Sequence, residues 1–187
     1  MDVTEATFED DVVERSRELP VVVDFWAAWC GPCRALTPVL EEQIAAREGS
    51  VALAKVDVDA NAGLAATYRV QGIPAVKAFR DGRVVSEFVG ALSPTAVSSF
   101  LDELLAPPRV AGVVEELRES GAYPEVLEAL EADDTERALD RILEAIADAS
   151  LEERERLREL ALAVFHDLGQ EDPLTVAYRR RLATALY

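Results

Sequence analysis

The chain has 187 residues and carries 36 acidic against 19 basic side chains, so its formal net charge is −17. Half of the residues are hydrophobic, which is typical of a globular protein and excludes collagen-like and low-complexity classes. The acidic excess runs through both halves of the chain and opposes phosphate binding, which argues against nucleic acid as a partner.

The amino-terminal sequence and the apolar runs favour neither export nor membrane insertion. Met1 is followed by acidic residues rather than by the basic and apolar stretches of a signal peptide. The longest near-apolar run, 20–30, is interrupted by Asp24 and is too short to span a bilayer. We therefore expect a cytoplasmic protein without a membrane partner. In that compartment a close cysteine pair is catalytic or metal-binding rather than part of a disulfide framework.

The first half of the chain alternates between strand and helix patterns. The β-branched and aromatic run 21–26 predicts a central strand that is buried on both faces. Helical spacing of apolar residues follows over 32–47, with Leu36, Val39, Leu40, Ile44 and Ala45 on one side and Gly49 as a stop. We then expect a strand over 51–58, a short helix over 62–68, a hairpin of strands 75–79 and 84–89 around Asp81-Gly82, and a helix to about 105 that Ser93 caps. This order predicts an α/β sandwich with a mixed sheet.

Pro107-Pro108 marks a boundary beyond which the strand pattern vanishes. Helices are predicted near 109–119, 123–132, 134–148, 151–168 and 173–186. These paired helices predict a small helical-repeat unit, although no clean 34-residue period is visible. The sequence thus predicts two domains, an α/β domain over 1–106 and an all-α domain over 107–187.

The strongest chemical motif is Trp29-Cys30-Gly31-Pro32-Cys33, where the first strand ends and a helix begins. The free backbone N–H groups and the dipole of a helix N-terminus stabilise a thiolate, so Cys30 is the expected nucleophile. Cys33 lies one turn further on, and Gly31 and Pro32 permit the tight turn between the two sulfur atoms. We expect Cys30 to attack a substrate disulfide and Cys33 to resolve the mixed disulfide.

Two other interpretations of the cysteine pair are weaker. Half of a structural zinc site would need further ligands, because zinc takes four and the chain offers two Cys and one His. A purely structural disulfide is less favourable still in a reducing compartment. We therefore expect no bound metal and no cofactor other than the redox-active pair Cys30 and Cys33.

Asp24 interrupts the apolar strand 21–26, where a buried carboxylate is costly and should have a raised pKa. It could lie beneath the cysteine pair and exchange a proton with Cys33 through water. In the alternative interpretation, Lys55 on the neighbouring strand compensates the carboxylate and Asp24 has no catalytic part. The two interpretations are compatible, and the proton role is favoured.

Residues 1–106 resemble thioredoxin. The run Val-Asp-Phe-Trp-Ala-Ala-Trp-Cys-Gly-Pro-Cys at 23–33 is close to that family's signature, and Gly72-Ile73-Pro74 is similar to its cis-proline loop. The resemblance implies a thioredoxin fold, a cis Pro74 against the cysteines, and an extended substrate held through the backbone of Ile73. It also matches Gly90 to the substrate groove, Asp24 and Lys55 to the buried pair, Pro38 to a helix kink, and Trp29 to the exposed contact surface.

The tail from about 122 onward resembles the helical module of bacterial chaperedoxins, thioredoxin-fold co-chaperones with tetratricopeptide-like repeats. The similarity is carried by the segments 138–143, 165–169, 172–174 and 178–182. This tail is shorter than the usual module of that group. His166, the one histidine of the chain, lies in the apolar stripe of a predicted tail helix and is expected as a surface or helix-end residue without a functional role.

Two functions from different classes follow. The first is an enzyme, a thiol-disulfide oxidoreductase that reduces protein disulfides, receives electrons from a thioredoxin-reductase-type donor and maintains cell redox balance. The second is a redox-linked co-chaperone whose tail binds unfolded clients or a chaperone partner. A tail that serves only packing or dimerisation is the alternative to the second.

Overall fold

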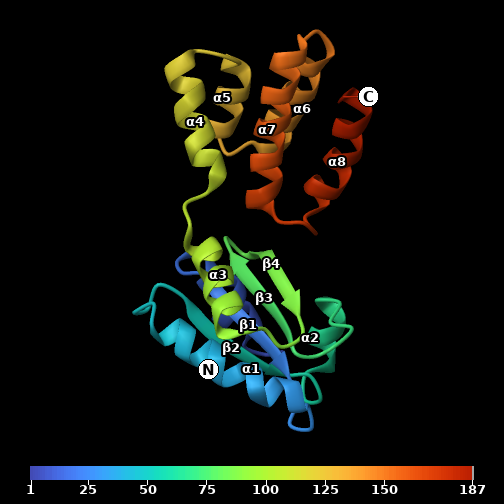
Figure 1. Cartoon of the computed structure of the whole chain (residues 1–187). Coiled ribbons are helices and arrows are strands. Elements are labelled where there is room, and N and C mark those ends of the chain that lie inside the picture. The colour runs from blue at the N-terminus through green and yellow to red at the C-terminus, as the bar shows by residue number, and fades with distance from the viewer. Residues whose placement is uncertain (187) are drawn as a thin grey trace. The chain divides into compact units, whose positions relative to one another are not determined.

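The computed structural model describes residues 1–186, and the chain divides into two compact units, Met1–Ala106 and Pro107–Tyr187. The first unit contains all four strands, and the second contains helices alone within the described residues (Figure 1). The expected order of an α/β domain followed by an all-helical region is confirmed.

The first unit is built on a mixed sheet in the order β2-β1-β3-β4. Its strands are β1 (Val21–Trp26), β2 (Ala52–Asp57), β3 (Ala75–Arg80) and β4 (Arg83–Val89). The central strand β1 pairs parallel with β2 and antiparallel with β3, and β3 pairs antiparallel with β4. Residues Val21 to Phe25 are buried, which confirms the prediction from their apolar run.

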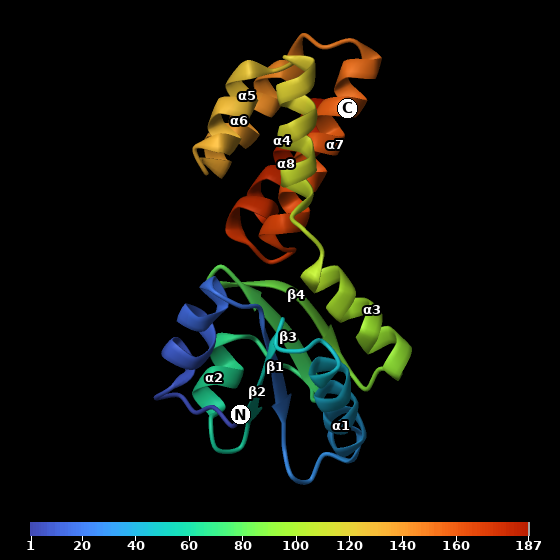
Figure 2. The same cartoon turned by 90° about the vertical axis from the view of Figure 1, so that its left-hand side faces the viewer.

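Helices cover both faces of this sheet (Figure 2). The helices α1 (Gly31–Ala45) and α3 (Pro94–Leu105) pack over Val22 on one face, and residues of η1 (Glu9–Glu14) and α2 (Ala62–Thr67) pack over Val21, Val23 and Phe25 on the other. Successive side chains of a strand point to opposite faces. Asp24 therefore points toward the same face as Val22, beneath α1.

Local sequence signals explain the turns of this unit. Asp81 and Gly82 both adopt positive φ angles, 54° and 78°, as a tight hairpin turn with a matching twist requires. The Ser93 side chain accepts a hydrogen bond from Ala96 N, which confirms the predicted cap of α3. Pro38 lies inside α1.

Two details differ from the sequence prediction. A helical segment precedes β1, formed by η1 with π-type turns and by η2 (Arg15–Arg17), and the acidic run at its start gave no clear amphipathic pattern. Its Val12 is nevertheless fully buried against the sheet. Ala45, expected on the buried side, is exposed because it is rotated by about 100° around α1 from the buried Ile44.

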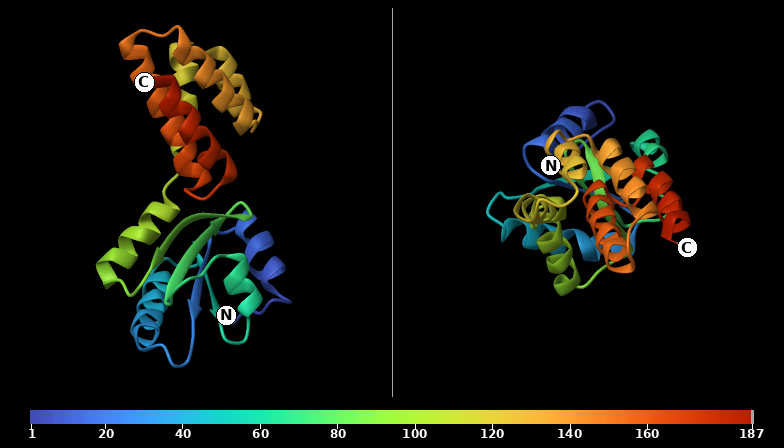
Figure 3. Two further views of the ribbon diagram at one scale, coloured as in Figure 1. Left: turned by 90° about the vertical axis from the view of Figure 1, so that its right-hand side faces the viewer. Right: turned by 90° about the horizontal axis from the view of Figure 1, so that it is seen from above.

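The second unit consists of five helices within the described residues, all close to the predicted ranges (Figure 3). They are α4 (Arg109–Ser120), α5 (Pro124–Glu131), α6 (Thr135–Ala147), α7 (Leu151–Leu168) and α8 (Pro173–Leu186). Helix α6 packs against α5, α7 and α8, and α4 packs against α5 and α7. Their common core includes Leu117, Ile142, Leu157 and Phe165.

Polar side chains fix the helix ends of this unit. Ser150 and Glu153 form a reciprocal capping box at the start of α7. The carboxylate of Asp167, near the end of α7, accepts hydrogen bonds from the backbone N–H groups of Arg109 and Val110 at 3.0 and 2.8 Å. These bonds satisfy two free donors at the start of α4 and join the two helices.

No helix within residues 1–186 combines the length and the apolar character needed to cross a membrane.

Candidate functional site

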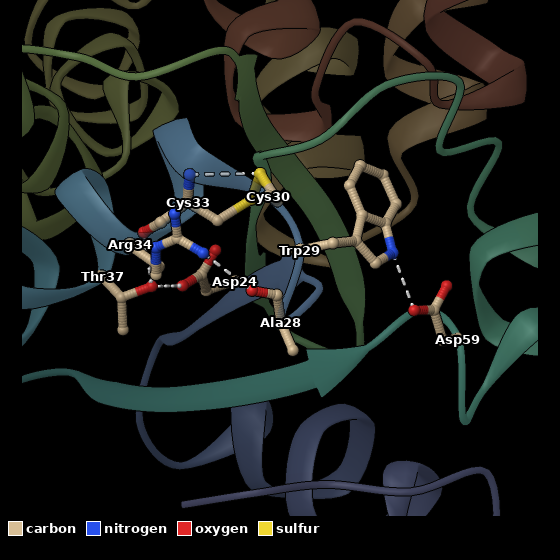
Figure 4. The surroundings of a disulfide bond; sticks show 8 residues. All are labelled: Asp24, Ala28, Trp29, Cys30, Cys33, Arg34, Thr37 and Asp59. Carbon is tan, nitrogen blue, oxygen red and sulfur yellow. Dashed lines mark hydrogen bonds between the residues drawn. A yellow bond between two sulfur atoms is a disulfide. The ribbon is translucent and has the colours of Figure 1, made fainter.

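Cys30 and Cys33 form a disulfide at the junction of β1 and α1, with their Cα atoms 5.3 Å apart (Figure 4). Cys30 is the N-cap residue of α1, and its Sγ accepts a hydrogen bond from Cys33 N at 3.1 Å. The same backbone N–H would stabilise a Cys30 thiolate after reduction of the disulfide. Both cysteines are buried in this oxidised state.

Gly31 and Pro32 occupy the first turn of α1 between the two cysteines, and both are exposed. Pro32 is tolerated there because the first N–H groups of a helix have no intrahelical acceptor. Next to them, Arg34 donates to Ala28 O at 3.0 Å, which places a cationic side chain beside the cysteine turn.

Asp24 is fully buried in β1, and its Oδ2 accepts a hydrogen bond from the Thr37 hydroxyl at 2.8 Å. Its Oδ1 has no hydrogen-bond partner among residues 1–186. Burial raises the pKa of Asp24 from 3.8 to about 6, while the bond from Thr37 and the charge of Lys55 act in the opposite direction. A carboxyl group with such a pKa can both accept and release a proton near neutral pH.

The structure corrects the interpretation in which Lys55 compensates Asp24 directly. The two residues are register partners on β1 and β2, but the Lys55 ammonium donates to Glu41 Oε1 at 3.0 Å. That bond raises the pKa of Lys55. The reason is position along α1: Glu41 follows Thr37 by one turn and reaches Lys55, while Thr37 reaches Asp24.

Trp29 lies beside the disulfide and is 67 % exposed, as expected of a contact surface. Its indole N–H donates to Asp59 Oδ2 at 2.8 Å, which holds the ring in one orientation (Figure 4). Trp26 at the end of β1 is partly buried and packs against the cluster of Ala27, Cys30 and Cys33. Of the two tryptophans, Trp29 is the exposed one.

The loop before β3 also reaches the disulfide. The Ile73–Pro74 peptide bond is cis, as the resemblance implies, and Ile73 packs against the cluster of Ala27, Cys30 and Cys33. Gly90, at a φ of +94°, donates its backbone N–H to Pro74 O at 2.8 Å. Ile73 thus contacts the cysteine cluster, and Gly90 is joined to this loop through Pro74.

Three residues of this region were missed from the sequence: Thr37, Glu41 and Asp59. The spacing of Thr37, four residues after Cys33 on a predicted helix, was the one available signal, since such residues lie on the same face. For Asp59, the fold brings together two loops that are 30 residues apart. Throughout residues 1–186 there is no cluster of three or more His, Cys, Asp or Glu side chains that could hold a metal ion.

Comparison with known proteins assigns both halves of the chain. Residues 1–103 match the family model described as thioredoxin, and residues 124–187 match a tetratricopeptide repeat model. The chain is 42 % identical over 102 residues to a thioredoxin of Pseudomonas aeruginosa, which covers 54 % of this chain and 93 % of the relative.

Other thioredoxins are similar to this chain over a comparable length. Thioredoxin 1 of Synechococcus elongatus is 43 % identical over 103 residues, which are 55 % of this chain and 94 % of the relative. Mitochondrial thioredoxin of Mus musculus is 46 % identical over 98 residues, which are 52 % of this chain and 58 % of that protein. These matches each span about half of the present chain.

Proposed function

The chain belongs to the thioredoxin family and is a protein-disulfide reductase, and from this premise we propose how its own residues carry out the reaction. Electrons enter from a thioredoxin-reductase-type donor and leave to disulfides of other proteins. The observation that carries the mechanism is the Cys30–Cys33 disulfide at the N-terminus of α1, with the buried Asp24 in the strand that leads to it.

In the first step the Cys30 thiolate attacks one sulfur of the substrate disulfide. A bond forms between Cys30 and that sulfur, the substrate S–S bond breaks, and the other substrate sulfur leaves as a thiolate. The Cys33 N–H and the helix terminus favour the thiolate form of Cys30 as the attacking species.

In the second step Cys33 resolves the mixed disulfide. Its thiol proton passes to Asp24 through water, and the Cys33 sulfur attacks the Cys30 sulfur. The Cys30–Cys33 bond forms, the second substrate sulfur leaves, and two electrons have passed to the substrate. The structure shows the oxidised state that this step produces.

The substrate segment lies over Trp29, Ile73 and Gly90 in this proposal. Trp29, which precedes Cys30, is 67 % exposed, and Val89, which precedes Gly90, is 66 % exposed. Both offer apolar surface to a substrate. The backbone of Ile73 would pair with an extended substrate, a mode that gives affinity without demanding one side-chain sequence. Lys55 acts at a distance through its charge and through Glu41.

Cytoplasmic action fits this direction of electron flow, because a reducing compartment regenerates the dithiol. We expect a reduction potential near the value of about −270 mV of thioredoxin. Equilibration with a glutathione buffer would measure it. A value above about −180 mV would make the protein an oxidant and contradict the proposal.

A trapping experiment tests the roles of the two cysteines. Cys33→Ser leaves the mixed disulfide unresolved, so client proteins should accumulate on Cys30 and be released by dithiothreitol. The matched control Cys30→Ser should trap none, and both variants should lose turnover of an insulin disulfide. Equal trapping by both variants would contradict the assigned order of attack.

A second function is proposed for the tail, on its match to a tetratricopeptide repeat model. We propose that residues 107–187 bind unfolded clients or a chaperone, as in the chaperedoxin group, while the cysteines protect client thiols. Leu162 on α7 and Val176 on α8 are exposed apolar side chains that support such binding.

Deletion of residues 107–187 separates the two functions. The shortened protein should still reduce insulin but no longer suppress the aggregation of a heat-unfolded test protein. Tryptophan fluorescence checks its folding, because Trp26 and Trp29 are the two tryptophans of the chain. If the shortened protein suppresses aggregation as well as the full chain does, the tail serves packing or dimerisation instead.

A further inference from the structure

Thr37 lies on α1, one turn after Cys33, and its hydroxyl has two acceptors. Oγ1 is 2.8 Å from Asp24 Oδ2 and 3.0 Å from the carbonyl oxygen of Cys33. Figure 4 shows the Thr37 and Asp24 side chains turned toward each other beneath the disulfide. A threonine hydroxyl carries one proton and can donate to only one of these oxygens at a time.

The two acceptors depend on this hydroxyl to different degrees. The Cys33 carbonyl belongs to α1, where the helix supplies it with a backbone donor from the following turn. The Asp24 carboxylate receives no other hydrogen bond from residues 1–186. Loss of the hydroxyl would therefore leave the Cys33 carbonyl satisfied and a buried carboxylate without any donor.

We propose that Thr37 is a positioning residue of the resolving step, which holds Asp24 by Oδ2 in its ionised form and leaves Oδ1 as the oxygen that takes the proton of Cys33. This inference rests on the proton role of Asp24 proposed above. A donor aimed at a charged carboxylate forms a stronger bond than one aimed at a neutral carboxyl group. Thr37 thus stabilises the form of Asp24 that can act as the base.

The proton and the hydroxyl move in sequence. While Asp24 is ionised, the Thr37 hydroxyl donates to Oδ2. When the Cys33 proton has arrived at Oδ1, Oδ2 becomes the weaker acceptor of a neutral carboxyl group, and the hydroxyl can turn to the Cys33 carbonyl at 3.0 Å. Apart from this transfer of the Cys33 proton to Asp24, covalent bonds change only among the sulfur atoms, and Thr37 keeps its own proton throughout.

Other groups around Asp24 cannot substitute for this bond. Lys55 of β2 favours the charged carboxylate and Glu41 of α1 disfavours it, and these two residues are paired with each other. On the other neighbouring strand, β3, the register partner is the uncharged Val76. On the side of α1, the remaining titratable group is the Cys33 thiol of the reduced protein, which is the proton source. The contact with Thr37 lowers the pKa of Asp24 against the larger effect of burial.

The test uses the full-length protein with Thr37→Val and the matched variant Thr37→Ser. Valine keeps the branched shape and removes the hydroxyl, whereas serine restores it. Carboxyl carbon NMR should show the Asp24 midpoint about one pH unit higher in Thr37→Val. The single-turnover rate of peptide-disulfide reduction falls on the acidic side of its pH profile. The pH of that fall should rise by the same amount in Thr37→Val, and the wild-type rate should be regained above about pH 8.5.

Thr37→Ser should return both the midpoint and the pH profile to those of the wild type. An Asp24 midpoint that stays in place in Thr37→Val, or that serine fails to restore, would overturn the role of Thr37. Asp24→Asn separates the two proposals. If Asp24→Asn resolves as fast as the wild type, the proton role of Asp24 fails together with this inference. If Asp24→Asn is slow and Thr37→Val leaves the profile unchanged, only the inference fails.

Discussion

The two units of this chain differ in the charged side chains that they bury. Met1–Ala106 buries Asp24 with one oxygen unbonded and also buries Lys77 of β3, which pairs with Glu87 of β4. In the second unit the fully buried polar residue is the uncharged Thr175, and ion pairs such as Arg118 with Glu131 join exposed side chains.

This difference corresponds to a reactive site in the first unit and to helix packing in the second. A buried carboxylate destabilises a fold unless a partner compensates it, and its raised pKa makes it useful for proton transfer. The helical unit contains no comparable charged group within the described residues, because a repeat-like module needs only stacked apolar faces to hold its shape. The redox unit is therefore destabilised by a buried carboxylate at the site where it reacts.

The largest effect is expected from truncating the core of the tail. Phe165→Ala removes a fully buried ring and should lower the free energy of unfolding of the second unit by about 3–5 kcal/mol. The helical circular dichroism signal should then show an early transition, while the fluorescence of Trp26 and Trp29 reports an unchanged first unit.

Leu162→Ala is the matched control on α7. Because Leu162 is already 39 % exposed, this substitution should lower the free energy of unfolding much less. If Phe165→Ala shifts the fluorescence transition as far as the circular dichroism transition, the two units unfold together and the comparison between them loses its basis.

Replacing the buried acid should have the next largest effect, with a defined dependence on pH. At low pH Asp24 is protonated in both the folded and the unfolded chain. Between pH 3.8 and about 6 the unfolded chain releases the proton while the folded chain retains it. Stability is therefore lost as pH rises through this window, and above it the folded state carries the full cost of about 3 kcal/mol.

Asp24→Asn should remove this pH dependence from the oxidised protein. Urea titrations followed by tryptophan fluorescence should give a variant whose free energy of unfolding, relative to that of the wild type, grows by about 2.5 kcal/mol between pH 4 and pH 8, since part of the change has already occurred at pH 4. A constant difference over that range would mean that Asp24 titrates equally in the folded and unfolded chains.

The smallest effect is expected at the polar contact between α7 and α4. Asp167→Ala removes two hydrogen bonds to the start of α4 and should destabilise the second unit by about 1–2 kcal/mol. Thermal unfolding followed by circular dichroism measures the change. Glu159→Ala, an exposed acidic position on the same helix, should leave the transition within about 0.5 kcal/mol of the wild type.

Much of the fold was predictable because its signals are local. The apolar run of β1, the Asp81-Gly82 turn and the Ser93 cap each depend on neighbouring residues, and the structure confirms all three. The helices of the tail were equally clear from their periodicity. The segment η1 was missed because its buried residues, such as Val12, are sparse among acidic ones.

The site was only partly predictable, because only some of its features depend on residues that are close together along the chain. The cysteine pair at a strand-to-helix junction is a local pattern, and so is a carboxylate within an apolar strand. Lys55 was assigned to Asp24 because the two strands were expected to be neighbours, and they are in register. The side chains of α1 decide the pairing, since Thr37 takes Asp24 and Glu41 takes Lys55.

The sequence by itself predicted the four strands, the helices from α1 onward and the place where the chain divides, and it singled out the two cysteines of the proposed reaction, because each of these follows from residues close together along the chain. Only the tertiary structure decided what stands next to Asp24 and Trp29. A hydrogen bond depends on distances of about 3 Å between groups that separate elements bring together, and no pattern along the chain specifies such distances.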